Sequence, residues 1–169
     1  PVLELAIGTG RVAIPLADRG LEVHGIELSA PMAERLHAKR PDLAVVVGDM
    51  ATATAPGAGF FTLVFVVFNS IGNVRTQDEQ VATFDNAARH LAPGGRFVVE
   101  LWVPPIRRCP PGQAAVPFDV SDRHVGFDTM DLATQLGTSH HYTHEPDGAV
   151  RYGTSNFRYI WPAECDLMA

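Results

Sequence analysis

The sequence predicts an α/β fold: a Rossmann-like doubly wound parallel sheet with an antiparallel β-hairpin appendage. Apolar runs of strand length alternate with helical patterns over residues 1–102, and a Gly-x-Gly turn directly follows the first run. Polar-alternating runs replace this pattern near the C-terminus. Because the doubly wound rule places later units on both sides of the first strand, we expect the parallel strands in the order 3-2-1-4-5.

The first predicted unit is a strand, a glycine turn and a short helix. Residues 2–7 are apolar except for Glu4, residues 8–10 form the turn, and residues 12–20 have the spacing of a helix that stops at Gly20. Backbone N–H groups and a helix N-terminus meet at such a turn and can hold an anionic group. Because residues 8–13 also match the dinucleotide pattern G-x-G-x-x-G/A, the turn indicates a nucleotide-type cofactor without identifying it.

Four more strands and two helices complete the predicted core. The further strands are residues 21–26, 43–47, 61–68 and 96–102. One helix starts after Ser29 and turns Met32 and Leu36 inward, with Met32 expected in the core rather than against a cofactor. The other starts at the capping box of residues 76–79 and ends near Leu91. Its inward residues are expected to be Val81, Phe84 and Ala88.

A different pattern follows the fifth strand, where several prolines exclude a helix interior. Two polar-alternating runs, residues 131–144 and 149–161, flank residues 145–148 (Glu-Pro-Asp-Gly), a strong turn signal for a hairpin. We therefore expect a cofactor-binding core over residues 1–103. A Pro-rich connection and an antiparallel hairpin over residues 104–169 are expected in the same structural domain, as a substrate-side wall or a dimerisation surface.

Composition and charge exclude several classes of function. The formal net charge of −6 disfavours nucleic acid and anionic membrane surfaces as partners. The longest apolar run, residues 60–68, is too short to cross a membrane, and the 2 cysteines are too far apart to suggest a disulfide framework. We therefore expect a cytoplasmic protein that binds neither nucleic acid nor membranes. The chain begins without Met inside its first strand and stops where a helix begins, so we also expect a fragment truncated at both ends.

Three acidic residues lie at or near the carboxyl ends of predicted strands, where open α/β sheets bind their ligands. Glu27 can accept hydrogen bonds from two adjacent ribose hydroxyls, and we expect it to contribute little to the core. Asp49 could accept one from the exocyclic amine of adenine, although an Asp after Gly48 also commonly forms a turn. Glu4 suits the cationic amino-acid tail of a ligand, a group that a nicotinamide dinucleotide lacks.

Five motifs, taken together, resemble a known family. They are residues 2–10, 23–27, 48–50, 65–70 and 91–100. In order and spacing they resemble class I S-adenosylmethionine-dependent methyltransferases, over residues 1 to about 102. The hairpin region resembles, more loosely, the antiparallel insertion of small-molecule members such as the amino-sugar N-methyltransferases. Ala6 departs from the family pattern, because a glycine is usual at that position.

The resemblance implies S-adenosylmethionine as the cofactor and methyl transfer to N or O of a small molecule. It implies that Glu4 and the glycine turn lie near the methionine end and that Glu27 lies at the ribose. It also implies that residues 49–50 lie at the adenine and that residues 68–69 lie below the sulfonium. The implied cofactor-binding residues are Glu4, Ala6, Gly8, Gly10, Glu27, Leu28, Asp49, Met50, Phe68 and Asn69.

A histidine-rich run, residues 140–144, supplies candidate catalytic groups. His140, His141 and Tyr142 could each serve as a general base for a protonated acceptor. On a strand, His140, Tyr142 and His144 share one face and His141 lies on the other. At most two imidazoles therefore converge, and no metal site is expected.

Two other functions stay open from the residues alone. An NAD(P)-dependent oxidoreductase would share the glycine turn and Glu27, but the chain has no Tyr-x-x-x-Lys motif and its single lysine is Lys39. A non-catalytic nucleotide-binding fragment is the second alternative. The expected partner is a small-molecule substrate, and the sheet edge exposed by truncation favours a homodimer.

Overall fold

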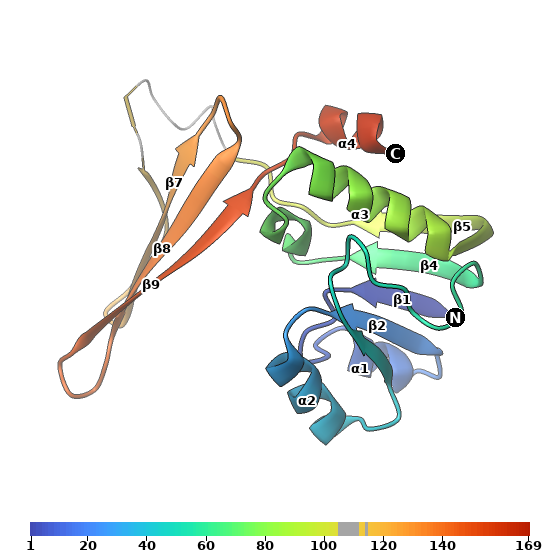
Figure 1. The fold of residues 1–169 in the computed structure, drawn as a ribbon. Coiled ribbons are helices and arrows are strands. Elements are labelled where there is room, and N and C mark those ends of the chain that lie inside the picture. Colours follow the sequence, from blue (N-terminus) through green and yellow to red (C-terminus); the bar gives the residue numbers. More distant parts are fainter. Residues whose placement is uncertain (105–111, 114) are drawn as a thin grey trace. The chain divides into compact units, whose positions relative to one another are not determined.

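A computed structural model describes residues 1–104, 112–113 and 115–169 of the chain (Figure 1). These residues form two compact units. Unit 1 comprises Pro1–Ile71, Gln77–Leu101 and Met168–Ala169, and unit 2 comprises Gly72–Thr76 and Trp102–Leu167. Of the prolines expected to interrupt the chain, Pro105, Pro110 and Pro111 lie outside the described residues.

Unit 1 is a five-stranded parallel sheet in the order β3-β2-β1-β4-β5, which confirms the predicted topology. The strands are β1 Val2–Leu5, β2 Val23–Glu27, β3 Ala44–Val47, β4 Phe61–Val66 and β5 Leu91–Val99. The helices of unit 1 are α1 Ala13–Ala17, α2 Ala30–Lys39 and α3 Gln77–His90. The 3-10 turn η1 Ser70–Asn73 has residues in both units, and α4 Pro162–Met168 belongs to unit 2 except for its last residue. In register, Leu5 of β1 pairs with Ile26 and with Val66, so the carboxyl ends of the three central strands lie at one edge.

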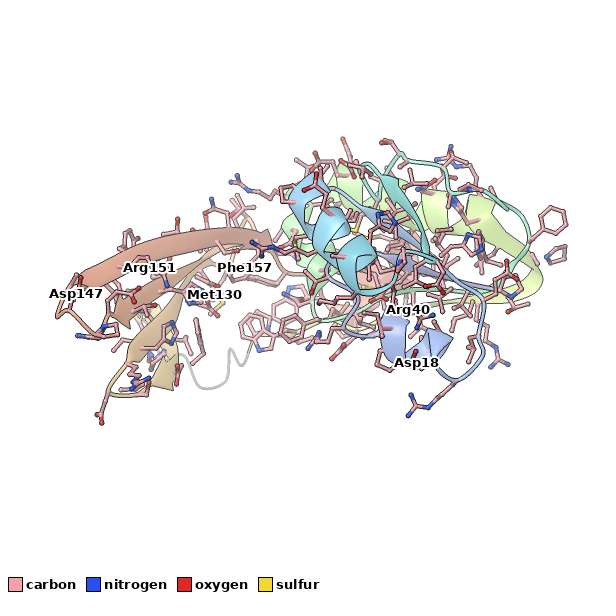
Figure 2. All side chains as sticks on the ribbon, turned by 90° about the horizontal axis from the view of Figure 1, so that it is seen from below. Asp18, Arg40, Met130, Asp147, Arg151 and Phe157 are labelled. Carbon is pink, nitrogen blue, oxygen red and sulfur yellow. The ribbon has the colours of Figure 1, made fainter. Side chains whose placement is uncertain are left out.

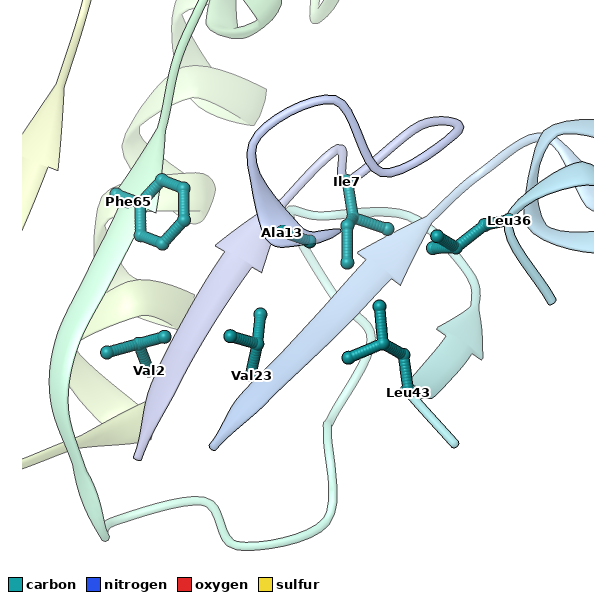
Figure 3. Packing of buried hydrophobic residues seen from close by; sticks show 7 residues of the cluster. All are labelled: Val2, Ile7, Ala13, Val23, Leu36, Leu43 and Phe65. Atoms are coloured by element: carbon teal, nitrogen blue, oxygen red, sulfur yellow. The ribbon is translucent and has the colours of Figure 1, made fainter. Parts of the chain in front are cut away.

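The core of unit 1 explains why its strands carry apolar residues on both faces. Every residue of β1 is buried, as expected for a central strand covered by helices. One cluster gathers Val2, Ile7, Ala13, Val23, Leu36, Leu43 and Phe65 (Figure 3). Gly25 of β2 belongs to this packing, because a Cβ there would lie 2.4 Å from the Cδ1 atom of Ile7.

Two helices differ from their predicted orientation. In α3, Phe84 is buried as expected, but Val81 and Ala88 are exposed. Its other buried residues are Gln80, Thr83, Asn86, Ala87 and His90. Of these, Asn86 and His90 hydrogen-bond a neighbouring loop, as described below, whereas the Thr83 hydroxyl donates to the Glu79 carbonyl of the same helix. In α2, Leu36 is buried, whereas Met32 is 39% exposed and therefore lies outside the core.

An ion pair cluster links the ends of α1 and α2 in unit 1. Arg40, which follows α2, pairs with Asp18, which follows α1 (Figure 2). It also pairs with Asp42. The Arg40 guanidinium lowers the pKa of Asp42 to about 2. Because these side chains are solvent-exposed in part, we attribute only a small stabilisation to them.

Unit 2 contains a four-stranded antiparallel sheet in the order β6-β7-β8-β9. The strands are β6 Ala115–Val120, β7 His124–Asp131, β8 Leu136–His144 and β9 Val150–Arg158. The predicted hairpin is confirmed as β8 and β9, which are joined by the turn that contains Asp147, near Arg151 of β9 (Figure 2). The sequence prediction missed β6 and β7 because the turn that joins them, residues 121–123, contains no glycine to signal it. This turn is stabilised by a side chain: the hydroxyl of Ser121 accepts the His124 N–H.

No helix in the described part of the chain is long and apolar enough to span a membrane.

Replacing Gly10 by alanine is expected to destabilise unit 1. Gly10 has φ +85°, and its new Cβ would lie 2.3 Å from Cδ1 of Leu36, so we expect a loss of about 2–4 kcal/mol from backbone strain and overpacking. Gly20→Ala is the matched control, because Gly20 has φ +84° but a Cβ there would meet no atom within 4 Å. Its loss of stability should therefore come from backbone strain alone. Denaturant unfolding measures both; equal losses in the two variants would contradict the packing argument.

Candidate functional site

A cavity of about 340 Å³ lies in unit 1 at the carboxyl ends of β1 and β4. Four of the predicted site residues line it: Glu4, Ala6, Gly8 and Phe68. Its other lining residues are Ile7, Thr9, Arg11, Val12, Met32, Val67 and Ser70. The prediction that Met32 is a core residue is therefore wrong, because its side chain forms part of the cavity wall beside the glycine turn.

The glycine turn forms the floor of this cavity with an unusual backbone. Ala6, Gly8 and Gly10 have φ values of 55°, 61° and 85°, in the left-handed region. A Cβ at Gly8 would lie 3.3 Å from Cε of Met32, so a side chain there would fill part of the cavity. Ala6 adopts a conformation that glycine would adopt with less strain, which accounts for the family's usual glycine.

Glu27 connects the end of β2 to the glycine turn. Its Oε2 accepts a hydrogen bond from the Gly8 N–H at 2.8 Å, and its Oε1 accepts one from the Ser29 N–H at 2.8 Å. The residue is only 7% exposed. The expectation that Glu27 contributes little to the folded core is therefore corrected, since its carboxylate fixes two backbone segments. Each oxygen retains a second lone pair that can accept a ligand hydroxyl.

Glu4 presents a buried carboxyl group to the cavity. The residue is 3% exposed, and its Oε2 atom has no hydrogen-bond partner. Burial raises the pKa of Glu4 to about 8, although the Ala13 N–H and the charge of Arg11 both act to lower it. A buried carboxyl with one unpartnered oxygen is unfavourable unless it is neutral or meets a cation, so Glu4 is suited to bind an ammonium group.

The loop after β3 carries the predicted adenine-side residues. Oδ1 of Asp49 accepts the Ala51 N–H at 2.8 Å, so this side chain does form the turn that the sequence allowed as an alternative. Met50 is buried at 8% exposure, whereas Leu28 is 70% exposed. Gly10, Glu27, Leu28, Asp49, Met50 and Asn69 do not line the 340 Å³ cavity.

Phe68 and Asn69 form a strained turn directly after β4. Their φ values are 58° and 57°. Glu100 holds both: its Oε2 accepts the Phe68 N–H at 2.8 Å, and its backbone carbonyl accepts the Asn69 N–H at 3.2 Å. The Arg11 guanidinium lies 4.1 Å from the centre of the Phe68 ring. Glu100 was not among the residues predicted for the site. Its position directly after β5, the strand beside β4, could have indicated that it lies close to the turn at Phe68.

Comparison with known proteins identifies the family. Residues 2–95, more than half of the chain, match the sequence family described as "Methyltransferase domain". The chain belongs to this methyltransferase family. The family resemblance expected from the five motifs is thereby confirmed, and the oxidoreductase alternative is not favoured.

Relatives of this methyltransferase domain include enzymes that act on amino sugars. The chain is 37% identical over 101 residues to a dTDP-3-amino-3,6-dideoxy-alpha-D-glucopyranose N,N-dimethyltransferase of Streptomyces fradiae, covering 60% of the chain but 39% of that relative. The CcbJ methyltransferase of Streptomyces caelestis superposes with a TM-score of 0.86 at 37% identity, covering 100% of this chain and 70% of CcbJ. Streptomyces venezuelae DesVI superposes with a TM-score of 0.74 at 26% identity, covering 99% and 72% of the two chains.

The candidate general bases of the methyltransferase lie on β8 in unit 2 and divide between two clusters. Nδ1 of His140 lies 2.7 Å from the Tyr152 hydroxyl, and the His140 ring stacks on Phe127 at 4.8 Å. Tyr142 also stacks on Phe127, so His140 and Tyr142 share one face as predicted. His141 instead pairs with His124, with their Nδ1 and Nε2 atoms 3.0 Å apart. Among the described residues, no group of three metal-ligating side chains converges.

Proposed function

We propose that this methyltransferase domain binds S-adenosylmethionine at the carboxyl edge of its parallel sheet and supports methyl transfer to N or O of a small molecule. The observation that carries this proposal is the cavity that joins the buried carboxyl of Glu4 to the glycine turn held by Glu27. This pair of features fits the cofactor, which carries an ammonium group at its amino-acid end and two hydroxyls on its ribose.

Each part of the site has a distinct task in this proposal. Glu4 binds the ammonium group of the amino-acid end, Glu27 accepts hydrogen bonds from the ribose hydroxyls, and Asp49 accepts one from the adenine amine. The turn at Phe68 and Asn69 forms the wall near the sulfonium and is kept in place by Glu100. When bound, the sulfonium supplies an electrophilic methyl group, so the chain's main contribution is to orient the acceptor.

The acceptor is proposed to be a small polar molecule with a nucleophilic nitrogen or oxygen. The Streptomyces fradiae relative and a Streptomyces venezuelae relative, 33% identical over 101 residues, are both named as N,N-dimethyltransferases of dTDP-linked amino sugars. These names favour an amine nitrogen in this chain too. A neutral imidazole or a phenol can remove the proton of such an acceptor, and His140, His141 and Tyr142 are the candidates.

The remaining assignments are also proposals. The net charge of −6 supports the expectation that the protein binds neither nucleic acid nor anionic membranes. The 2 cysteines, far apart in the sequence, support the proposal that it acts in the cytoplasm. Unit 2, with its antiparallel sheet, is proposed to form the substrate-side wall or a homodimer surface. The 101 residues aligned with the Streptomyces fradiae relative cover 39% of that relative, so the activity and acceptor of the whole protein are proposals.

Calorimetric titration with S-adenosylhomocysteine and, separately, with NAD tests the proposed cofactor. We expect S-adenosylhomocysteine to bind with a Kd in the micromolar range or below and NAD to give no measurable heat of binding. Binding of NAD without S-adenosylhomocysteine would support the oxidoreductase alternative. Binding of neither compound would support the non-catalytic fragment.

A further inference from the structure

The buried face of α3 is largely polar, with four polar side chains beside Phe84 and Ala87. Asn86 is 2% exposed and His90 is 1% exposed, although neither belongs to the predicted site. Burying a polar side chain is unfavourable unless its hydrogen-bonding groups find partners. The partners of these two side chains therefore indicate what they do.

Asn86 and His90 both bind the loop that follows β3. Nδ2 of Asn86 donates one hydrogen bond to the Met50 carbonyl and one to the Ala53 carbonyl, each at 2.9 Å. Nε2 of His90 accepts the Ala55 N–H at 2.9 Å. Its Nδ1 lies 2.7 Å from the Asn86 carbonyl, which fixes Nδ1 as the protonated nitrogen of a neutral ring.

These contacts replace the regular structure that the loop lacks. Residues 48–60 separate β3 from β4 and contain no helix or strand. Within the loop, the Asp49 carbonyl accepts the N–H groups of Thr52 and Ala53. Asn86 and His90 then attach this turn to α3 at three backbone positions. The conformation of Asp49 therefore depends on two side chains from a helix that is distant in sequence.

We propose that Asn86 and His90 are positioning residues, which hold the loop of residues 49–55 so that Asp49 reads the adenine base. This inference rests on the proposed S-adenosylmethionine site and names the residues that set its base specificity. Neither side chain needs to touch the cofactor. Both act through the backbone of the loop, at the carbonyls of Met50 and Ala53 and the amide of Ala55.

Three variants separate positioning from general stability. Asn86→Asp keeps the size of the side chain but faces two carbonyls with a carboxylate, and His90→Phe removes the acceptor of the Ala55 N–H. His90→Gln can restore an acceptor oxygen near the position of Nε2. Thr83→Val is the matched control, because Thr83 is fully buried in α3 and its hydroxyl donates to Glu79 of the same helix.

The readout is the affinity ratio between S-adenosylhomocysteine and S-inosylhomocysteine, in which a carbonyl oxygen replaces the base amine and N1 carries a hydrogen. We expect wild-type protein to prefer the adenosyl compound by roughly tenfold or more, because the inosyl compound loses the charged hydrogen bond to Asp49 and presents an oxygen to that carboxylate. Asn86→Asp and His90→Phe are each expected to weaken binding of the adenosyl compound about tenfold and to bring the ratio near one. His90→Gln and Thr83→Val should keep the wild-type ratio.

A fall in the folded fraction alone would change both affinities equally and leave the ratio intact. An unchanged ratio in folded Asn86→Asp and His90→Phe proteins would therefore overturn the inference. Equal wild-type affinity for the two compounds would overturn it as well, because the loop would then not read the base. If Asn86→Asp does not fold, the His90 pair carries the test. Failure of wild-type protein to bind S-adenosylhomocysteine would instead overturn the proposed function.

Discussion

Replacing Glu27 by alanine is expected to weaken S-adenosylhomocysteine binding roughly 30- to 150-fold, which corresponds to about 2–3 kcal/mol for a bidentate charge-assisted contact. The same change is expected to lower the free energy of unfolding by about 1–3 kcal/mol, because the N–H groups of Gly8 and Ser29 lose their acceptors. Calorimetric titration measures the affinity, and denaturant unfolding measures the stability.

Glu27→Gln is the control for this prediction. The amide keeps one acceptor oxygen but turns an NH2 group toward one of the two backbone N–H groups. We therefore expect a smaller loss of affinity than for alanine. If affinity is unchanged while the melting temperature falls sharply, Glu27 serves only the fold and the proposed ribose contact is wrong.

Glu4 should couple cofactor binding to pH. The carboxyl group has a pKa of about 8 in the folded protein, so it is largely protonated at pH 7. Binding an ammonium group requires the charged form, and binding at pH 7 should therefore release a proton. We expect the affinity for S-adenosylhomocysteine to rise as the pH increases from 6 to about 8 and then to level off. Titrations in buffers of different ionisation enthalpy measure the released proton directly.

The same group should make the unbound protein less stable at higher pH. The folded pKa of about 8 lies above the ordinary value of 4.5, so between these values the unfolded chain has lost a proton that the folded chain keeps. Stability from this group is fully present below pH 4.5 and is lost as the pH rises toward 8. Glu4→Gln should remove this slope and the proton release. Glu22→Gln, at an exposed carboxylate, should keep both; a Glu4→Gln protein with an unchanged pH profile would contradict the assignment.

Local patterns in the sequence were sufficient to predict the parallel sheet. Residues 2–7 are apolar except for Glu4 because β1 lies between two other strands and is buried on both faces. The Gly-x-Gly turn signals the end of that strand because Gly8 and Gly10 adopt left-handed backbone conformations that other residues avoid. These local constraints and the repeated strand and helix pattern predicted a parallel sheet, and the doubly wound rule then predicted its strand order.

The parts that could not be predicted depend on contacts between distant residues. Asn86 and His90 disrupt the apolar periodicity of α3, and only their partners in the loop after β3 explain why they are buried. Met32 has the spacing of a core residue, yet its exposure depends on the open cavity beside Gly8. A helical pattern alone cannot distinguish a side chain that faces the core from one that faces a cavity at its edge.

The candidate site was predicted in outline but not in its connections. Glu4 and Glu27 were proposed as site residues from their positions at or near strand ends, where α/β sheets bind ligands. The sequence did not reveal that Glu27 already binds two backbone amides or that Glu100 holds the turn at Phe68. Such connections require the register of neighbouring strands, which local patterns do not specify.

A backbone-amide NMR titration with S-adenosylhomocysteine tests most directly whether the cofactor occupies the carboxyl edge of the sheet. We predict large chemical-shift changes at the amides of Gly8, Ser29 and Ala51, which all donate to site carboxylates. A second cavity of about 450 Å³, lined by His24 and Leu43 among others, lies at the opposite edge and should remain unaffected. Shifts confined to that second cavity, with none at the glycine turn, would contradict the account.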